Sequence, residues 1–198
     1  MSSRLARIGF LMFVSMTLSA LVADSAGKWE ASRSGSGRFL AYSGVATVLG
    51  KATPVTVKFF CDTTYTPNEK GALGFDLTLG HVAALAPFHF DDFEGPDAPA
   101  VEKQLLVVTI TRRGKEPLSF KVAPSGSYPE EGTFTFEGSD VTHKAVSTPK
   151  SLLRALGEDA DELRFTITDY RNAKLKIELT IPVAGKRADF KALVAGVK

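Results

Sequence analysis

Apolar and polar residues alternate along most of this chain, and that pattern constrains the fold more than any other feature of the sequence. Side chains two residues apart lie on the same face of a strand, so the alternation predicts sheets with one apolar face and one solvated face. The run 105–110 is apolar on both faces of the expected strand, which predicts a central strand. The alternating runs are 73–79, 118–122, 134–136, 163–167 and 175–181.

Turn residues separate these runs at short intervals. Residues 113–117 and 170–173 each contain glycine, proline or asparagine between two predicted strands. Short connections favour antiparallel pairing. We therefore expect an all-β fold with about eight or nine strands, either an antiparallel β-sandwich or a partly closed barrel. Periodicity does not give strand order, so both architectures stay open.

Two short helices are expected beside the strands. The first has Thr148 as its cap, Pro149 at its first position and Gly157 at its end. The second covers 187–195, where apolar residues at helical spacing begin with Phe190. We expect this second helix to pack on a sheet or over one end of the fold.

The first 23 residues are typical of a signal peptide. Arg4 and Arg7 form a basic start, an apolar stretch follows, and small residues then favour cleavage after Ala23. An uncleaved membrane anchor is the alternative, although polar residues interrupt an apolar run shorter than the ~20 residues that span a bilayer. The predicted location is the periplasm or the exterior of the cell.

The remaining chain is predicted to form one domain. Residues 24–37, of which 31–37 are rich in serine and glycine, are interpreted as a flexible lead-in, and residues 38–198 as a single β-rich domain. The chain has one cysteine, Cys61, at the end of an alternating run. A buried structural thiol is the favoured interpretation, with an intermolecular disulfide or a nucleophile as alternatives.

Charge gives little support for a nucleic-acid partner. Loss of Arg4 and Arg7 with the signal leaves equal numbers of basic and acidic residues. All charged residues of 91–102 are acidic, and most charged residues of 174–198 are basic. We interpret the basic segment as a solvated face, and contact with an acidic partner is the alternative.

Catalytic and metal-binding motifs are not recognised. The three histidines, His81, His89 and His143, lack the HExxH spacing, and His89 with Asp91 supplies too few ligands for a zinc site. The acidic segments lack the calcium-loop pattern, and no GxSxG, CxxC or phosphate-binding glycine loop is present. We therefore predict no catalytic residues, no metal and no cofactor, although paired carboxylates of a hydrolase are not detectable by spacing.

One segment stands out as a candidate binding site because it combines aromatic and acidic residues. Such a loop can form a recognition edge beside a sheet. The favoured alternative is that the rings anchor a long crossover onto the core. Trp29 and Tyr128 are weaker candidates. The predicted binding residues are Phe88, His89, Phe90, Asp91, Asp92 and Phe93.

The layout resembles small exported bacterial proteins of the invasion-associated locus B kind. The shared features are a signal peptide, an early Trp29, a strand ending in Phe60-Cys61, successive hairpins, and a final helix carrying Phe190 and Leu193. The resemblance implies a β-sandwich envelope protein that acts by binding. It assigns no functional residue to this chain.

The function expected from the sequence is that of a non-enzymatic binding module whose partner is another envelope protein or an envelope component. One alternative is a carrier of a small apolar ligand, which requires a continuous interior pocket. The other is a periplasmic hydrolase, which requires a cleft where carboxylates, or a histidine and a carboxylate, converge.

Overall fold

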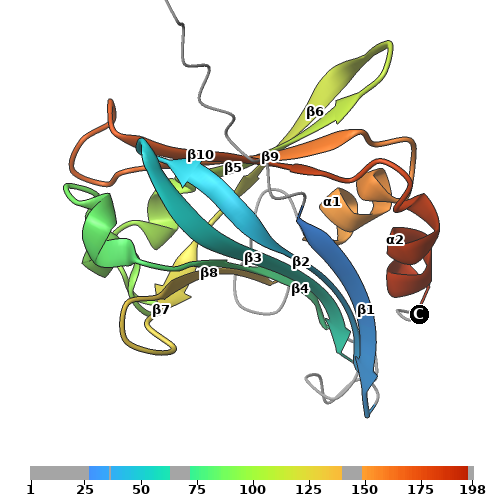
Figure 1. Cartoon of the computed structure of the whole chain (residues 1–198), viewed down its shortest axis with the longest axis horizontal. Helices are drawn as coiled ribbons and strands as arrows, with labels where there is room; N and C mark the ends of the chain where they lie inside the picture. The colour runs from blue at the N-terminus through green and yellow to red at the C-terminus, as the bar shows by residue number, and fades with distance from the viewer. Residues whose placement is uncertain (1–26, 36, 63–71, 140–148, 196–198) are drawn as a thin grey trace, which may run out of the picture.

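The computed structural model describes residues 27–35, 37–62, 72–139 and 149–195. Within these ranges the chain forms ten strands in two open antiparallel sheets, together with two short α-helices. The sheets lie face to face as a β-sandwich (Figure 1). The all-β prediction and the sandwich alternative are therefore confirmed.

The larger sheet has six strands. Strands β1 and β7 form its two edges, and the long β2–β3 hairpin lies next to β1. The strand order is β1 (Lys28–Ser34), β2 (Gly37–Val48), β3 (Lys51–Asp62), β4 (Ala72–Leu79), β8 (Phe134–Ser139) and β7 (Ser125–Ser127).

The smaller sheet has four strands, and the predicted central strand is one of its two inner strands. That strand, β5, pairs with β9 on one side and β6 on the other. The strand order is β10 (Lys176–Pro182), β9 (Glu162–Thr168), β5 (Leu106–Arg112) and β6 (Lys115–Val122).

The alternating residues of both sheets meet in the core. In β4, for example, Leu73, Phe75, Leu77 and Leu79 are all completely buried. Phe75 of the larger sheet contacts Phe165 of the smaller one, with 5.7 Å between ring centroids. Burying a side chain of this size contributes roughly 1.5–3 kcal/mol, so the period-two pattern is also the main source of stability.

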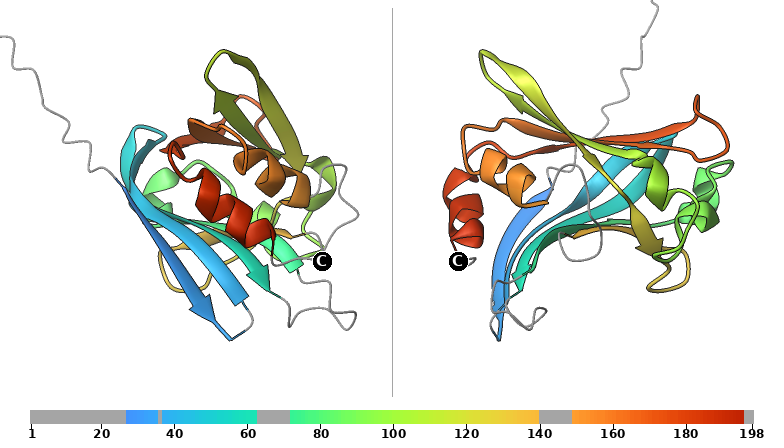
Figure 2. Two further views of the ribbon diagram at one scale, coloured as in Figure 1. Left: turned by 90° about the vertical axis from the view of Figure 1, so that its right-hand side faces the viewer. Right: turned by 180° about the vertical axis from the view of Figure 1, so that it is seen from behind.

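Both helices fill the space between the sheets at one side of the sandwich (Figures 1 and 2). Helix α1 (Pro149–Leu156) contacts β4, whereas α2 (Arg187–Val194) packs on β2 and β3. Gly157 donates its backbone N–H to the carbonyls of Leu153 and Arg154, which ends α1 where the sequence predicted. Thr148, the predicted cap, lies outside the described residues.

A long crossover covers the opposite side (Figure 2). It connects β4 with β5 and so takes the chain from one sheet to the other. Three short 3₁₀ helices shape it: η1 (Val82–Leu85), η2 (Phe90–Phe93) and η3 (Val101–Lys103).

The predicted lead-in at 24–37 is wrong over residues 28–34, because these form the edge strand β1. Every residue of this strand pairs with β2, from Lys28 with Ser43 to Ser34 with Gly37. An edge strand has one neighbour and little apolar surface to bury, so its serine-rich composition concealed it. β1 and the three-residue β7 account for the strands beyond the expected eight or nine.

The structure tests the interpretation of Cys61 but not that of the first 23 residues. Cys61 is 1% exposed, so the buried-thiol interpretation is confirmed. The proposed signal peptide lies outside the described residues and stays a prediction. None of the helices in the described part of the chain is long and apolar enough to span a membrane.

Candidate functional site

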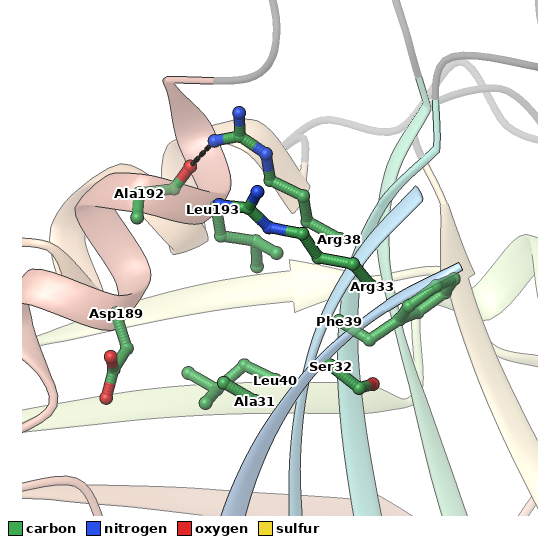
Figure 3. A pocket seen from close by; sticks show the side chains of 9 residues that line it. All are labelled: Ala31, Ser32, Arg33, Arg38, Phe39, Leu40, Asp189, Ala192 and Leu193. Carbon is green, nitrogen blue, oxygen red and sulfur yellow. Dashed lines mark hydrogen bonds between the residues drawn. The ribbon is translucent and has the colours of Figure 1, made fainter. Parts of the chain in front are cut away.

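A cleft opens between the edge of the larger sheet and helix α2 (Figure 3). We call it the β1–α2 cleft. Its volume is about 320 Å³, at the lower end of the range for small-molecule sites. Side chains from both strands of the first hairpin and from α2 line it: Ala31, Ser32, Arg33, Arg38, Phe39, Leu40, Asp189, Ala192 and Leu193.

Two arginines lie side by side at one end of the cleft (Figure 3). Arg33 and Arg38 are direct cross-strand partners, so the register of the hairpin places both side chains on the same face. The turn between them starts at Gly35, whose φ of 55° is readily adopted by glycine. Like charges directly opposite each other are unfavourable, so this placement is not explained by strand stability.

The two guanidinium groups differ in their contacts. Arg38 donates from Nη1 to the carbonyl of Ala192 near the C-terminal end of α2, at 2.8 Å. Arg33 makes no hydrogen bond or ion pair with any residue that the structure describes. The acidic residue of the lining, Asp189, lies 3.6 Å from the Lys186 ammonium. The arginine end of the cleft therefore has positive charge that no described carboxylate neutralises.

Apolar residues form the floor of the cleft. Leu40 and Leu193 are buried, whereas Ala31 of the edge strand is exposed. Trp29 lies two residues before Ala31 on the same face of β1 and packs edge-on against Phe190 of α2, at 5.9 Å between centroids. Its indole donates to the carbonyl of Pro182, which holds β1 against the end of β10.

The binding segment predicted from the sequence lies at the opposite side, and its rings face inward. Phe88 and Phe90 are each 6% exposed and Phe93 is fully buried. They pack against Phe134 and Phe136 of β8, with ring centroids 5.1 to 6.5 Å apart. The alternative interpretation, in which the rings anchor the crossover on the core, is therefore confirmed.

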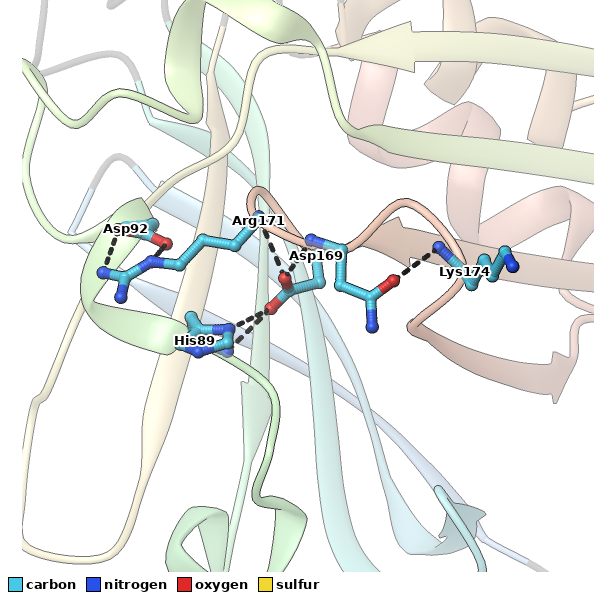
Figure 4. Close-up of polar contacts among 6 residues, drawn as sticks. His89, Asp92, Asp169, Arg171 and Lys174 are labelled. Carbon is cyan, nitrogen blue, oxygen red and sulfur yellow. Dashed lines mark hydrogen bonds and ion pairs between the residues drawn. The ribbon is translucent and has the colours of Figure 1, made fainter.

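Two polar residues of that segment, His89 and Asp92, are held by the turn that connects β9 and β10 (Figure 4). Asp169, whose side chain is fully buried, accepts hydrogen bonds from the backbone N–H and Nδ1 of His89, at 2.8 and 3.0 Å. It also accepts the backbone N–H groups of Arg171 and Asn172. Burial acts to raise the pKa of Asp169, but these hydrogen bonds outweigh it and lower the pKa below its ordinary value.

Arg171 completes a reciprocal link between the same two segments. Its Nε and Nη2 donate to the two carboxylate oxygens of Asp92, at 2.7 and 2.8 Å, in a bidentate pair. Asp91 accepts a hydrogen bond from the Tyr128 hydroxyl at 2.6 Å. Burial together with this bond raises the pKa of Tyr128. Each polar residue of the predicted site thus has a partner within the protein.

The positions of the histidines and carboxylates bear on the metal-site and hydrolase alternatives. Among the described residues, no three or more His, Cys, Asp or Glu side chains cluster as ligands of a metal ion. His143 lies outside those residues. His89 does converge on a carboxylate, Asp169, but that carboxylate is buried and anchored by three backbone N–H groups. This is the pattern of a structural anchor for the crossover and turn.

The β1–α2 cleft was not predicted from the sequence, for an identifiable reason. Treating 24–37 as a lead-in removed Arg33 from consideration. The sequence did contain a clue, because the Gly-Ser pair at 35–36 predicts a two-residue hairpin turn, and such a turn places Arg33 opposite Arg38. Asp169 left no comparable signal, since its contact with His89 spans 80 positions.

Comparisons with protein-family models, with curated proteins and with solved structures find no match to this chain. The resemblance to invasion-associated locus B proteins therefore stays a prediction.

Proposed function

We propose that this protein is a non-enzymatic binding module that takes a ligand with an anionic group in the β1–α2 cleft. The signal-like start of the sequence supports a location in the periplasm or outside the cell, where the partner is another envelope protein or an envelope component. The ligand carries a carboxylate or similar anion together with an apolar part.

The observation that carries this proposal is the guanidinium of Arg33, which lies beside Arg38 and has no partner among the residues that the structure describes. Two adjacent guanidinium groups repel each other in the free protein, and an anion between them removes that repulsion. Hydrogen bonds from arginine to an anion are among the stronger ones in proteins, at about 1.5–3 kcal/mol each. The apolar floor next to the arginines suits an apolar group attached to that anion.

The two alternative functions have less support. A carrier needs an interior cavity, whereas the inward positions of both sheets are occupied by fully buried side chains such as Phe75, Leu77 and Phe165. A hydrolase needs a histidine that is available for chemistry, and the His89–Asp169 contact instead joins the crossover to the β9–β10 turn.

A matched pair of small probes tests the proposal. N-acetyl-leucinate and N-acetyl-leucinamide share an apolar side chain and differ in the carboxylate. Trp29 is the single tryptophan of the chain and lies beside the cleft, so its fluorescence reports binding there. We expect saturable millimolar binding of the carboxylate and at least about tenfold weaker binding of the amide.

Variants locate the site. Arg33→Gln combined with Arg38→Gln is expected to abolish the preference for the carboxylate. Arg113→Gln is the matched control, because Arg113 is 92% exposed on the turn between β5 and β6. Equal binding of both probes, equal effects of the two sets of variants, or the absence of any saturable response would contradict the proposal.

A further inference from the structure

We propose that the ligand of the β1–α2 cleft is an extended polypeptide segment that adds to β1 as a further strand of the larger sheet and presents a carboxylate to Arg33 and Arg38. This inference rests on the proposed function and specifies the class of partner. Strand addition is a common mode of peptide recognition, in which main-chain hydrogen bonds give affinity and pockets for alternate side chains give specificity.

Within the described part of the chain, no strand pairs with the outer edge of β1. β1 pairs with β2 on one side and ends the sheet on the other. All its residues except Trp29 are exposed. In an antiparallel pair, every second residue turns its N–H and C=O away from the partner strand. Counted from Ser34, which pairs with Gly37 at the end of the hairpin, these outward residues are Arg33, Ala31 and Trp29.

The same residues face the cleft. Along a strand, the direction of the side chain and the direction of the main-chain N–H and C=O groups both change at every residue. Ala31 and Arg33 therefore direct their side chains toward α2, and their N–H and C=O groups point away from β2. A strand added here places its own alternate side chains beside those of Ala31 and Arg33, about 4.5–5.5 Å away. Ala192 of α2 forms the facing wall.

Charge selects a carboxylate-bearing segment. Arg33 lies on the edge strand itself and Arg38 directly behind it on β2, so both can reach an anion on the adjacent strand. Charged edge strands also discourage aggregation. Lys28 and Glu30 suit that role, because they pair with each other at 2.6 Å on the outer face, with side chains 77% and 65% exposed. Arg33 lies on the opposite face, toward the cleft.

The size of the cleft agrees with this mode of binding. A volume of about 320 Å³ accommodates one or two side chains of a peptide, whereas the rest of an added strand lies along the exposed edge. The partner is then recognised by its extended conformation, by one apolar side chain and by one carboxylate.

The probe is the pentapeptide N-acetyl-Val-Thr-Val-Thr-Leu with a free C-terminal carboxylate, compared with N-acetyl-leucinate. We expect the pentapeptide to bind at least about tenfold more tightly, because it adds main-chain hydrogen bonds to β1. N-methylation of alternate residues on the bonding edge is expected to remove that gain. An amidated form ending in glutamate distinguishes an acidic side chain from a C-terminal carboxylate as the preferred group.

A proline variant tests the edge itself. Ala31→Pro removes an outward N–H and leaves the pairing with β2 intact, since proline is tolerated on edge strands. We expect it to remove the gain from chain extension, so that the pentapeptide binds this variant no more tightly than N-acetyl-leucinate does, and to abolish the slowed amide exchange that the peptide produces at Arg33. A melting temperature close to that of the unmodified protein shows that the variant is folded.

The outcomes separate this inference from the proposed function. If N-acetyl-leucinate binds but chain extension gives no gain, or Ala31→Pro has no effect, strand addition is wrong and the cleft remains an anion site. If no probe binds, both proposals fail. If β1 amides are protected without peptide and the protein is dimeric, a second copy occupies the edge and the inference is overturned.

Discussion

The two sides of the sandwich use similar side chains for different purposes. At the crossover side, phenylalanine rings and carboxylates meet, and each group has a partner: the rings lie in the core, Asp92 pairs with Arg171, and Asp169 anchors His89. At the cleft side, aromatic residues again pack between strands and helix, but Arg33 has no partner among the described residues. The paired charges at the first side have a structural role, and we propose that the Arg33 cation, which has no partner in the described ranges, serves binding at the second side.

The largest expected effect comes from removing a ring at the crossover side. Phe93 is fully buried and stacks on Phe88 at 5.6 Å between centroids. Phe93→Ala is expected to lower the free energy of unfolding by about 3–5 kcal/mol, since the cavity left behind adds to the lost burial. Urea denaturation measures this change. A loss below about 1 kcal/mol would show that the segment does not anchor the crossover.

Substitution of Asp169 tests whether hydrogen bonds, as well as buried rings, stabilise the crossover side. Asp169→Ala leaves backbone N–H groups of His89, Arg171 and Asn172 without their acceptor, which is expected to cost about 3 kcal/mol. Asp159→Ala is the control, because Asp159 is 75% exposed in a surface ion pair and is expected to change stability by less than about 1 kcal/mol. Equal losses for the two variants would contradict the anchoring role.

Asp76 lies in the middle of β4, on the outer face of the larger sheet. It is expected to make the free energy of unfolding depend on pH. Burial raises the pKa of Asp76 to about 6, and Glu137 adds to the rise while Lys58 opposes it. Because the folded state binds this proton more tightly than the unfolded state, stability is expected to fall as pH rises from about 4 through 6.

Substitution by asparagine isolates this effect. Asp76→Asn removes the charge and is expected to raise the free energy of unfolding at pH 8 by about 1–2 kcal/mol, after allowance for partial exposure of the side chain. Urea titrations at pH 4 and pH 8 measure the difference. An Asp76→Asn protein whose stability still falls as steeply as that of the unmodified protein would locate the pH dependence elsewhere.

The smallest effect on stability is expected at the cleft. Arg33→Gln removes an exposed side chain with no described partner, so the free energy of unfolding is expected to change by no more than about 0.5 kcal/mol. Binding of N-acetyl-leucinate is nevertheless expected to weaken about tenfold. This combination distinguishes a binding residue from a structural one, and a large loss of stability without a loss of binding would reverse the assignment.

The sequence predicted the parts of this fold that depend on local pattern. Alternation at Leu73 to Leu79 identified β4 and its core face, and Pro149 and Gly157 correctly bounded α1. Strand β1 was missed because an edge strand needs few apolar residues. The order of strands in the sheets was not predictable, because pairs such as β4 with β8 join residues about sixty positions apart.

The candidate site was harder to predict than the fold. Phe88 to Phe93 attracted attention because aromatic and acidic residues are neighbours in sequence, but burial and pairing with Arg171 depend on the distant β9–β10 turn. Arg33 and Arg38 are ordinary residues in sequence. Their significance comes from lying opposite each other with no described carboxylate to neutralise them.

The most direct test of the account is a chemical-shift map of the isotope-labelled protein titrated with N-acetyl-leucinate. We expect the perturbed amide resonances to lie in β1, the start of β2 and α2, with the side-chain Nε–Hε resonances of Arg33 and Arg38 among them. The resonances of residues 88–93 and 169–172 are expected to stay unchanged. Perturbations concentrated at 88–93, with an unchanged β1–α2 cleft, would contradict the assignment of binding to the open side of the sandwich.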